Sequence, residues 1–275
     1  MTPNSHAWRL IIDGDNRGSW NMAVDEAIML AQARGENPPT IRLYGWRPPA
    51  VSIGYFQDFV KEIDLESCRR LGIDWVRRPT GGRAVLHENE VTYSVAVPES
   101  VLRGSVLETY LVLSNGLVAA LRSLGADAGV VSRGGVHKGS SAACFDAPSS
   151  YEVVCGGKKV IGSAQTRHNG IILQHGSIPL RFDAARAAAV LKLDSERTRE
   201  RIAANLSERA AGLEQVLGRP VGAAEVRAAL IDGFARGLGL EMRPGALTGA
   251  EEADAARLEM DKYSNPGWNE QKQGR

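Results

Sequence analysis

A cysteine on a polar loop is the residue of this sequence best placed to act as a nucleophile. Cys144 stands among small residues in SSAACFDAPSSYEVV, on a loop that leads into a predicted strand, whereas Cys68 falls in a helical pattern and Cys155 at a strand end. A thiol attacks a carbonyl carbon as its thiolate, and a nearby cation stabilises that form. We therefore predict Cys144 as a nucleophile that needs a cation. The alternative is a small, inert apolar residue.

The segment GGKKVIGSAQT offers that cation. Lys158 and Lys159 are neighbours on a predicted strand and therefore point to opposite faces of the sheet. An ammonium on the covered face is costly unless it neutralises an anion, so Lys159 is predicted to meet the Cys144 thiolate. The alternative is that both lysines lie on an exposed hairpin.

Histidines also lie near these segments. They are relevant because a cysteine beside an imidazole is a common catalytic pair. His137 precedes Cys144 by seven residues on the same loop and is a candidate general base. His175 is a second candidate site residue, although it and His87 can equally serve as hydrogen-bonding groups at strand ends. No HxxxH or CxxC spacing occurs, so we predict no metal site, and three cysteines are too few for a disulfide framework.

The segment RRPTGGRAVLH, residues 77–87, combines glycines with cations between two predicted strands. Gly81 and Gly82 allow a positive φ and a close approach of the backbone to a ligand, while Arg77, Arg78 and Arg83 supply donors. This combination suits a phosphate or an acyl-pantetheine group. The alternative is a plain glycine turn with solvated arginines. P-loop and dinucleotide spacings are both missing, so the pattern does not indicate nucleotide binding.

Helical and strand patterns segregate along the chain rather than alternate. Apolar spacing predicts a helix over 19–34 with Ser19 as its cap, and a second over 105–124 with Ser105 and Glu108 as a capping box. Between them we expect a short helix at 64–72 and a meander of strands, not β-α-β units. After a loop over 129–143, strands are expected again, with a hairpin turn at Gly156 and Gly157. The predicted strands are 40–46, 50–56, 73–78, 83–88, 90–97, 150–155, 158–166 and 170–180.

The remaining sequence is predicted to be helical from 183 to 240, with an interruption near Gly218, and again after Thr248. This pattern predicts an α+β fold in which a mixed, largely antiparallel sheet is packed by helices and carries a helical C-terminal appendage. We expect one domain over 8–245 and a tail over 246–275.

The overall charge excludes recognition of nucleic acid by bulk attraction. The chain of 275 residues carries 33 Lys and Arg against 32 Asp and Glu, a net charge of +1. Residues 129–170 hold five basic and two acidic residues, and this local charge of +3 could steer an acidic protein partner or simply be solvated. No membrane-spanning run or signal-peptide layout is present, so we expect a cytoplasmic protein with no membrane partner.

Together, the segments RRPTGGRAVLH, SSAACFDAPSSYE and GKKVIGSAQTRHNGIILQHGSI resemble the lipoate-protein ligase A and biotin-ligase-like catalytic family. The nearest resemblance is to its octanoyltransferase branch, and it covers about residues 8–245, including WNMAVDEAI and YGWRPPAVSIGYFQ. It implies a biotin/lipoate-ligase-like fold and a transfer of octanoyl groups in lipoate biosynthesis.

The resemblance also implies roles for single residues. Cys144 would take the octanoyl group from octanoyl acyl carrier protein as a thioester, Lys159 would hold the thiolate, and a lysine of a lipoyl carrier such as the glycine-cleavage H protein would accept the group as an amide. No ATP, metal or other cofactor is implied, and we expect a monomer. The substrate-binding residues on this reading are Arg77, Arg78, Thr80, Gly81, Gly82, Arg83, Ala84, His87, Gly162, Ser163 and Ala164.

Three other functions remain open at this point. A sister branch moves octanoyl or lipoyl groups from the H protein to other lipoyl domains and also uses a cysteine. An ATP-dependent lipoate-protein ligase shares the arginine-glycine motif and the strand lysine but is not expected to carry the cysteine. A non-catalytic module that binds acyl carriers would leave Cys144 inert.

Overall fold

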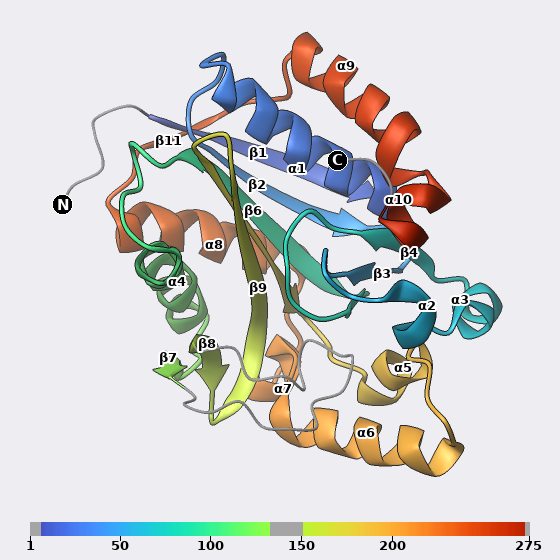
Figure 1. The fold of residues 1–275 in the computed structure, drawn as a ribbon. Coiled ribbons are helices and arrows are strands. Elements are labelled where there is room, and N and C mark those ends of the chain that lie inside the picture. The colour runs from blue at the N-terminus through green and yellow to red at the C-terminus, as the bar shows by residue number, and fades with distance from the viewer. Residues whose placement is uncertain (1–6, 133–150, 273–275) are drawn as a thin grey trace.

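The computed structural model describes residues 7–132 and 151–272, and within them the chain folds around one large and one small β-sheet (Figure 1). The large sheet has eight strands in the order β11-β1-β2-β6-β10-β9-β8-β7, and the small sheet has three in the order β4-β3-β5. The strands of the large sheet are β1 (Trp8–Asn16), β2 (Thr40–Trp46), β6 (Glu90–Pro98), β7 (Ala128–Ser132), β8 (Tyr151–Cys155), β9 (Lys158–His168), β10 (Ile171–Pro179) and β11 (Met242–Pro244). Those of the small sheet are β3 (Ala50–Ile53), β4 (Asp74–Arg77) and β5 (Val85–His87).

Pairing in the large sheet is mostly antiparallel, which confirms the predicted fold class. Only β1 pairs in parallel there, with β11 and with β2, while the pairs from β2 through β6, β10, β9 and β8 to β7 are antiparallel. The Gly156–Gly157 turn joins β8 to β9 as expected, with positive φ at both glycines.

The meander predicted between the two long helices is wrong, because the strands there do not all follow one another as antiparallel neighbours. One β-α-β unit leads into this region and a second lies within it. β1 reaches its parallel neighbour β2 through helix α1 (Gly18–Ala33), and β3 reaches β4 through α2 (Phe59–Glu62) and α3 (Leu65–Leu71). The segments 40–46 and 50–56 consequently end in different sheets. β7 also occupies residues that were predicted as loop. Short apolar runs identify strands but carry no information on which strand pairs with which.

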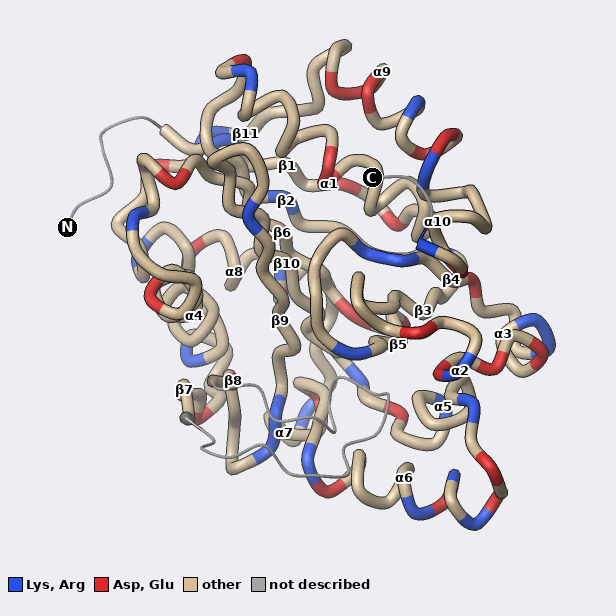
Figure 2. The backbone as a smooth tube through the Cα atoms, viewed as in Figure 1, with Lys and Arg blue, Asp and Glu red and all other residues tan. Residues whose placement is uncertain are grey.

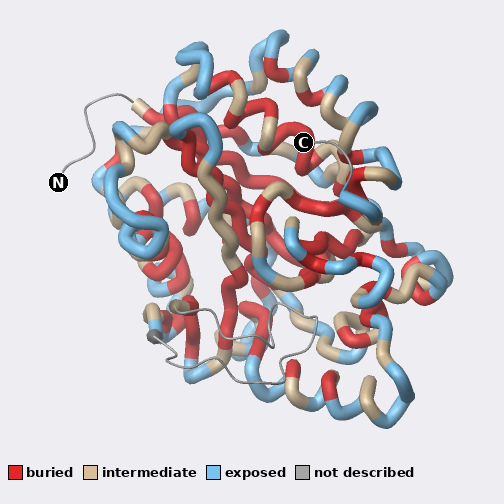
Figure 3. Tube along the Cα trace, viewed as in Figure 1, coloured by how far each residue is buried: buried red, intermediate tan, exposed pale blue. Residues whose placement is uncertain are grey.

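Helices cover both faces of the large sheet (Figure 1). One face carries α1 and α9 (Gly249–Leu258), and the other carries α4 (Val106–Ser123) and α8 (Ala223–Leu238). The central strands are buried on both sides (Figure 3). The other helical segments are α5 (Ala184–Ala189), α6 (Glu196–Arg209), α7 (Leu213–Leu217), a π-helical turn η1 (Glu259–Tyr263) and α10 (Pro266–Gln271).

Helix starts follow the predicted capping at α4 but not at α1. The Ser105 and Glu108 capping box is present. α1 begins one residue before the predicted cap, at Gly18, and the Ser19 hydroxyl instead donates a hydrogen bond to Glu259. Cations and anions are interspersed along α6 and α9 (Figure 2). In the described part of the chain, no helix is long and apolar enough to cross a membrane.

Two glycines allow α4 and α8 to pack closely. A Cβ atom at Gly116 would lie 2.6 Å from the Phe234 ring, and one at Gly233 would lie 2.6 Å from the Cβ of Ala120. Both distances are far below van der Waals contact, so each position requires glycine.

We expect Gly233→Ala to destabilise the protein by about 1–3 kcal/mol, because the added methyl group forces the two helices apart. This cost outweighs the gain of about 1 kcal/mol that alanine brings to a helix. Urea unfolding measures the change. Gly249→Ala is the control, since a Cβ there meets nothing within 4 Å; equal stability of the two variants would contradict the packing argument.

Residues far apart in the sequence meet at the edge of the large sheet. The Arg9 guanidinium on β1 donates two hydrogen bonds, of 2.7 and 2.5 Å, to the carboxylate of Glu251 on α9. Both side chains are buried. β11 lies on the outer side of β1, so residues separated by more than 200 positions form this edge.

Candidate active site

A cavity brings together the glycine loop and the β9 motif that the sequence singled out. It lies between the small sheet and strands β9 and β10, and encloses about 410 Å³ of non-atom space, part of it open to solvent. Predicted site residues from both motifs line it: Arg78, Gly82, His87, Gly162, Ser163, Ala164 and His175. The other lining residues are Met22, Tyr44, Trp46, Ser52, Val85, Thr92, Gly176 and Ser177.

The loop between β4 and β5 has a backbone that only glycine can adopt. Gly82 has a φ of +90°. A Cβ atom at Gly54 would lie 2.0 Å from the carbonyl oxygen of Gly82. The two backbone segments are therefore in direct contact, and their approach forms one wall of the cavity.

Arg78 holds this loop together from within. Its Nε donates to the Thr80 hydroxyl at 3.2 Å, and its Nη2 donates to the carbonyls of Gly81 and Arg83, both at 2.7 Å. Nη1 donates to the backbone and to the hydroxyl of Ser52, both at 3.1 Å. The guanidinium thus bonds to the protein through all three nitrogens, and we interpret it as the scaffold of the loop.

A buried network behind Arg78 centres on Asp25 of α1. The carboxylate accepts hydrogen bonds from Arg42 (2.9 Å), Ser94 (2.8 Å), Tyr44 (3.0 Å) and His175 Nδ1 (3.1 Å). Burial alone would raise the pKa of Asp25, but the bond from His175 and the charge of Arg42 outweigh it, and the pKa is lowered. Asp25 is therefore a carboxylate at neutral pH.

His175 links this carboxylate to the loop. Burial lowers the pKa of His175, so its ring is neutral at pH 7. With the proton on Nδ1 facing Asp25, Nε2 accepts the hydroxyl proton of Thr80 at 2.7 Å. The order Asp25, His175, Thr80, Arg78 is thus a continuous chain of hydrogen bonds that ends at the cavity wall.

The lowered pKa of His175 predicts a loss of stability in acid. In the unfolded chain a histidine takes up a proton below about pH 6.5, whereas folded His175 resists protonation, so the free energy of unfolding should fall as the pH drops from about 6.5 toward the folded pKa, by at most about 1.4 kcal/mol per pH unit. In His175→Gln this slope should decrease. Urea unfolding at pH 7.5 and 5.5 measures it, with the exposed His168→Gln as control; an unchanged slope in His175→Gln would refute the assignment.

A second histidine and carboxylate pair flanks Arg78 on the other side. His87 Nδ1 contacts Glu90 Oε1 at 2.8 Å, and its Nε2 contacts the Ser52 hydroxyl at 2.7 Å. The His87 ring stacks on Trp46 with centroids 3.9 Å apart. Ser52 also accepts a hydrogen bond from Arg78. Each histidine therefore contacts a hydroxyl group that is hydrogen-bonded to the same guanidinium: His87 contacts Ser52 and His175 contacts Thr80.

Five of the predicted substrate-binding residues do not line the cavity. Thr80 is buried behind the wall, and Ala84 packs in the small-sheet core. Arg77 is buried and donates to backbone carbonyls, including those of Gln57 and Trp268. Gly81 contributes its carbonyl to Arg78.

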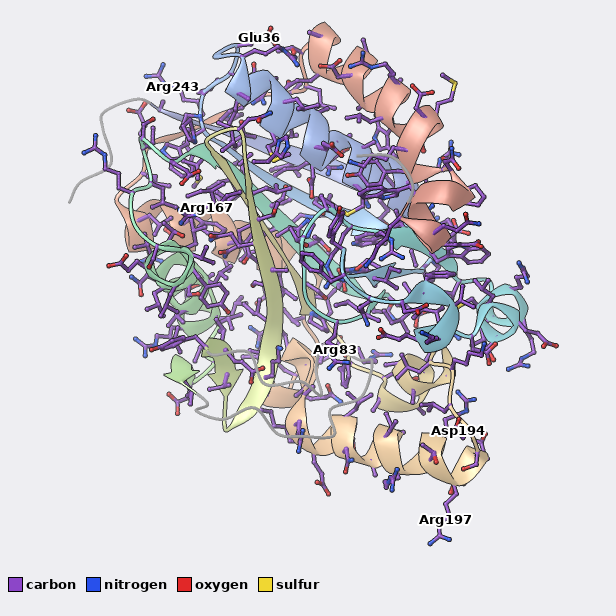
Figure 4. The ribbon with its side chains drawn as sticks, viewed as in Figure 1. Glu36, Arg83, Arg167, Asp194, Arg197 and Arg243 are labelled. Atoms are coloured by element: carbon purple, nitrogen blue, oxygen red, sulfur yellow. The ribbon has the colours of Figure 1, made fainter. Side chains whose placement is uncertain are left out.

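Arg83 is partly buried and also lies outside the lining. In the view of Figure 4 its side chain lies between β9 and α5.

Lys159 is buried, while Lys158 is more exposed, as the alternation along β9 predicted. Lys159 Nζ lies 2.9 Å from Oε1 of Glu152 on β8. This carboxylate was not predicted from the sequence. Cys144 and His137 lie outside the described residues.

The two described cysteines are poor nucleophiles. Burial raises the pKa of both Cys68 and Cys155 to about 11, so neither is a thiolate at neutral pH. Among the residues that the structure describes, no group of three or more His, Cys, Asp or Glu is arranged to hold a metal ion.

Several residues that organise this site were missed from the sequence. Asp25 interrupts the apolar face of α1, Arg42 stands in the buried strand TIRLYGW, and Glu152 stands in YEVVC. A charge inside an apolar run is costly unless it is paired, so these three positions carried a usable signal.

Comparison with known proteins identifies the family. The family model described as the lipoyl protein ligase A/B catalytic domain matches residues 17–235. The chain belongs to the lipoyl protein ligase A/B catalytic family. This membership confirms the resemblance that the motifs gave. The prediction of an acyl-group transferase is confirmed by relatives named octanoyltransferase.

Individual relatives of this lipoyl protein ligase A/B family member cover nearly its whole length. The octanoyltransferase LipM of Kyrpidia tusciae is 53% identical over 272 residues, covering 96% of this chain and 99% of the relative. The octanoyltransferase LipM of Symbiobacterium thermophilum is 48% identical, covering 96% and 98%. A solved structure of a bipartite lipoate protein ligase and its E2 lipoyl domain from Thermoplasma acidophilum superposes with a TM-score of 0.83 at 30% identity, covering 98% and 99%. A lipoate-protein ligase A bound with ATP superposes with a TM-score of 0.78 at 30% identity, covering 96% and 99%.

Proposed function

We propose that this protein transfers an octanoyl group from octanoyl acyl carrier protein, through a thioester on Cys144, to a lysine of a lipoyl carrier such as the glycine-cleavage H protein. The observation that carries the proposal is the 53% identity, over nearly the whole chain, to a relative named octanoyltransferase. The cavity that joins the arginine-glycine motif to the β9 motif supports it.

The proposed reaction has two steps. The Cys144 thiolate attacks the donor thioester, the bond between the acyl carbon and the carrier sulfur breaks, and the carrier leaves as a thiolate. A neutral lysine amine then attacks the new thioester, Cys144 leaves as a thiolate, and the amine loses one proton as the amide forms. A thioester is already activated, so the chemistry needs no ATP.

The cavity suits the acyl part of such a donor. Met22, Trp46, Val85 and Ala164 provide apolar surface. Arg78, the cation in the lining, is bonded to the loop backbone and to hydroxyl groups. The apolar surface suits the hydrocarbon chain of an acyl group.

Lys159 is proposed to stabilise the Cys144 thiolate. The support is its burial on β9, three residues before the lining residue Gly162. The buried ammonium already has an anionic partner in Glu152, so a role toward Cys144 would be additional to that ion pair.

Intact-protein mass spectrometry tests the proposal directly. Octanoyl acyl carrier protein should add one octanoyl group on Cys144 without ATP, and adding the H protein should move that group to its lysine. Octanoylated H protein in place of the carrier tests the amidotransferase alternative. Free octanoate with ATP tests the ligase alternative, which the likeness to a lipoate-protein ligase bound with ATP makes relevant. Acylation that occurs only with ATP, or none on Cys144, would refute the proposal.

A further inference from the structure

The last described residues of the chain reach the strand that precedes the glycine loop. Trp268 and Asn269 of α10 are buried, although they lie near the C-terminal end and beyond the region that the family model matches. In Figure 1 α10 follows α9 and η1 and lies beside β4. The segment is anchored on α1, where Glu26 accepts hydrogen bonds from Lys262 and Tyr263.

Three hydrogen bonds join this segment to Arg77, the last residue of β4. The Arg77 backbone N–H donates to Asn269 Oδ1 at 2.9 Å, and Trp268 Nε1 donates to the Arg77 carbonyl at 2.9 Å. Arg77 Nε donates to the Trp268 carbonyl at 3.0 Å. The side chain of Asn269 is itself fixed, because its Nδ2 donates to the Tyr263 carbonyl at 2.7 Å.

From Arg77 the contacts continue to the cavity wall. Arg77 Nη1 donates to the carbonyls of Gly54, Tyr55 and Gln57 at 3.2, 3.1 and 2.9 Å. The Tyr55 N–H in turn donates to the carbonyl of Thr80 at 2.9 Å. Segment 54–57 is therefore hydrogen-bonded both to the glycine loop, through Thr80, and to Arg77.

Glycine contacts complete the route. Gly54 packs directly on the Gly82 carbonyl, and Gly82 lines the cavity. The path from the C-terminal segment to the cavity thus consists of hydrogen bonds between buried or partly buried residues, followed by one close backbone contact to Gly82.

We propose that Asn269 and Trp268 are positioning residues for acyl transfer: through Arg77 they set the place of segments 54–57 and 78–82, and thereby the shape of the cavity wall. The effect on transfer rests on the function proposed above, whereas the effect on the two segments does not.

Hydrogen exchange tests the structural part without any substrate. Asn269→Ala should increase exchange at the amides of Tyr55, Arg77 and Arg78, relative to amides of the β6–β10 pair. Thr248→Ala is the matched control, because it removes the cap of α9 in the same C-terminal region without affecting a contact of Arg77. If the two variants raise exchange at these amides equally, the positioning role is refuted.

Acylation kinetics test the functional part. For Asn269→Ala we expect the half-saturating concentration of octanoyl acyl carrier protein to rise about fivefold, with the maximal rate of Cys144 acylation changed less than about twofold, since the wall contacts the donor rather than the nucleophile. Asn269→Asp keeps an acceptor for the Arg77 N–H but loses the bond from Nδ2 to the Tyr263 carbonyl, so its effects on exchange and on donor affinity should lie between those of Asn269→Ala and wild type. Trp268→Phe keeps the ring packing but removes the bond to the Arg77 carbonyl, and should show the alanine effect in milder form.

The outcomes separate the two proposals. Wild-type protein that is never acylated contradicts the proposed function, and the exchange result still decides whether the C-terminal segment positions the two segments. Acylation kinetics of Asn269→Ala equal to those of Thr248→Ala would overturn the inferred role in transfer.

Discussion

Replacing Cys144 by serine is expected to lower octanoyl transfer by at least about a thousandfold. A cysteine side chain already holds a few per cent of thiolate at neutral pH and more beside a cation, whereas a serine hydroxyl supplies almost no alkoxide without a strong base. The measurement is the rate of amide formation on the acceptor, together with the mass of the enzyme after exposure to the donor.

Cys155→Ala is the control for this variant. Its thiol is buried, with a pKa raised to about 11, so its loss should leave acylation intact. Iodoacetamide at pH 7 should likewise label Cys144 faster than Cys68 or Cys155. Transfer at the wild-type rate by Cys144→Ser would exclude the covalent mechanism and favour the ATP-dependent alternative.

The second large effect is expected at Lys159. Lys159→Met removes the ammonium that lies 2.9 Å from the buried Glu152 carboxylate. Loss of one partner of a buried ion pair costs about 3–5 kcal/mol, so urea unfolding should show a strongly destabilised protein. If Lys159 also stabilises the Cys144 thiolate, the rate of acylation at pH 7 should fall and its pH optimum should move upward.

A double variant separates these two roles. Lys159→Met combined with Glu152→Leu removes both charges from the pair and should regain much of the lost stability. Its acylation rate at pH 7 should remain low, because the cation beside the thiolate is still missing. A stable double variant with the wild-type pH profile would assign Lys159 a purely structural role.

The features of the fold that could be predicted are those determined by residues close together in the sequence. The helix pattern of α4, its capping box and the Gly156–Gly157 hairpin all depend on neighbours in sequence, and each is present. The parallel pairing of β3 with β4 depends on contacts across two helices, which no local pattern encodes. The meander was predicted for that reason.

The part of the site that could be predicted is the part in which the type of a single residue, such as glycine, determines the local backbone or the space beside it. Gly82 and the Gly162–Ala164 segment reach one cavity, as expected from two motifs with unusual backbone and small side chains. The roles of Arg77 and Arg78 were not predictable, because a guanidinium that bonds to carbonyls looks the same in sequence as one that binds a phosphate. Only the placement of Trp268 and the loop carbonyls distinguishes the two.

The pairing of Arg9 with Glu251 has a consequence for how the chain matures on the ribosome. Because 242 positions separate the two residues, β1 leaves the ribosome long before its outer neighbour β11 and its counter-ion on α9 are made. Until then one edge of β1 is open and its guanidinium has no carboxylate from α9. This edge of the sheet can therefore form only after residues 242–251 have been synthesised, which makes its closure a late step of folding.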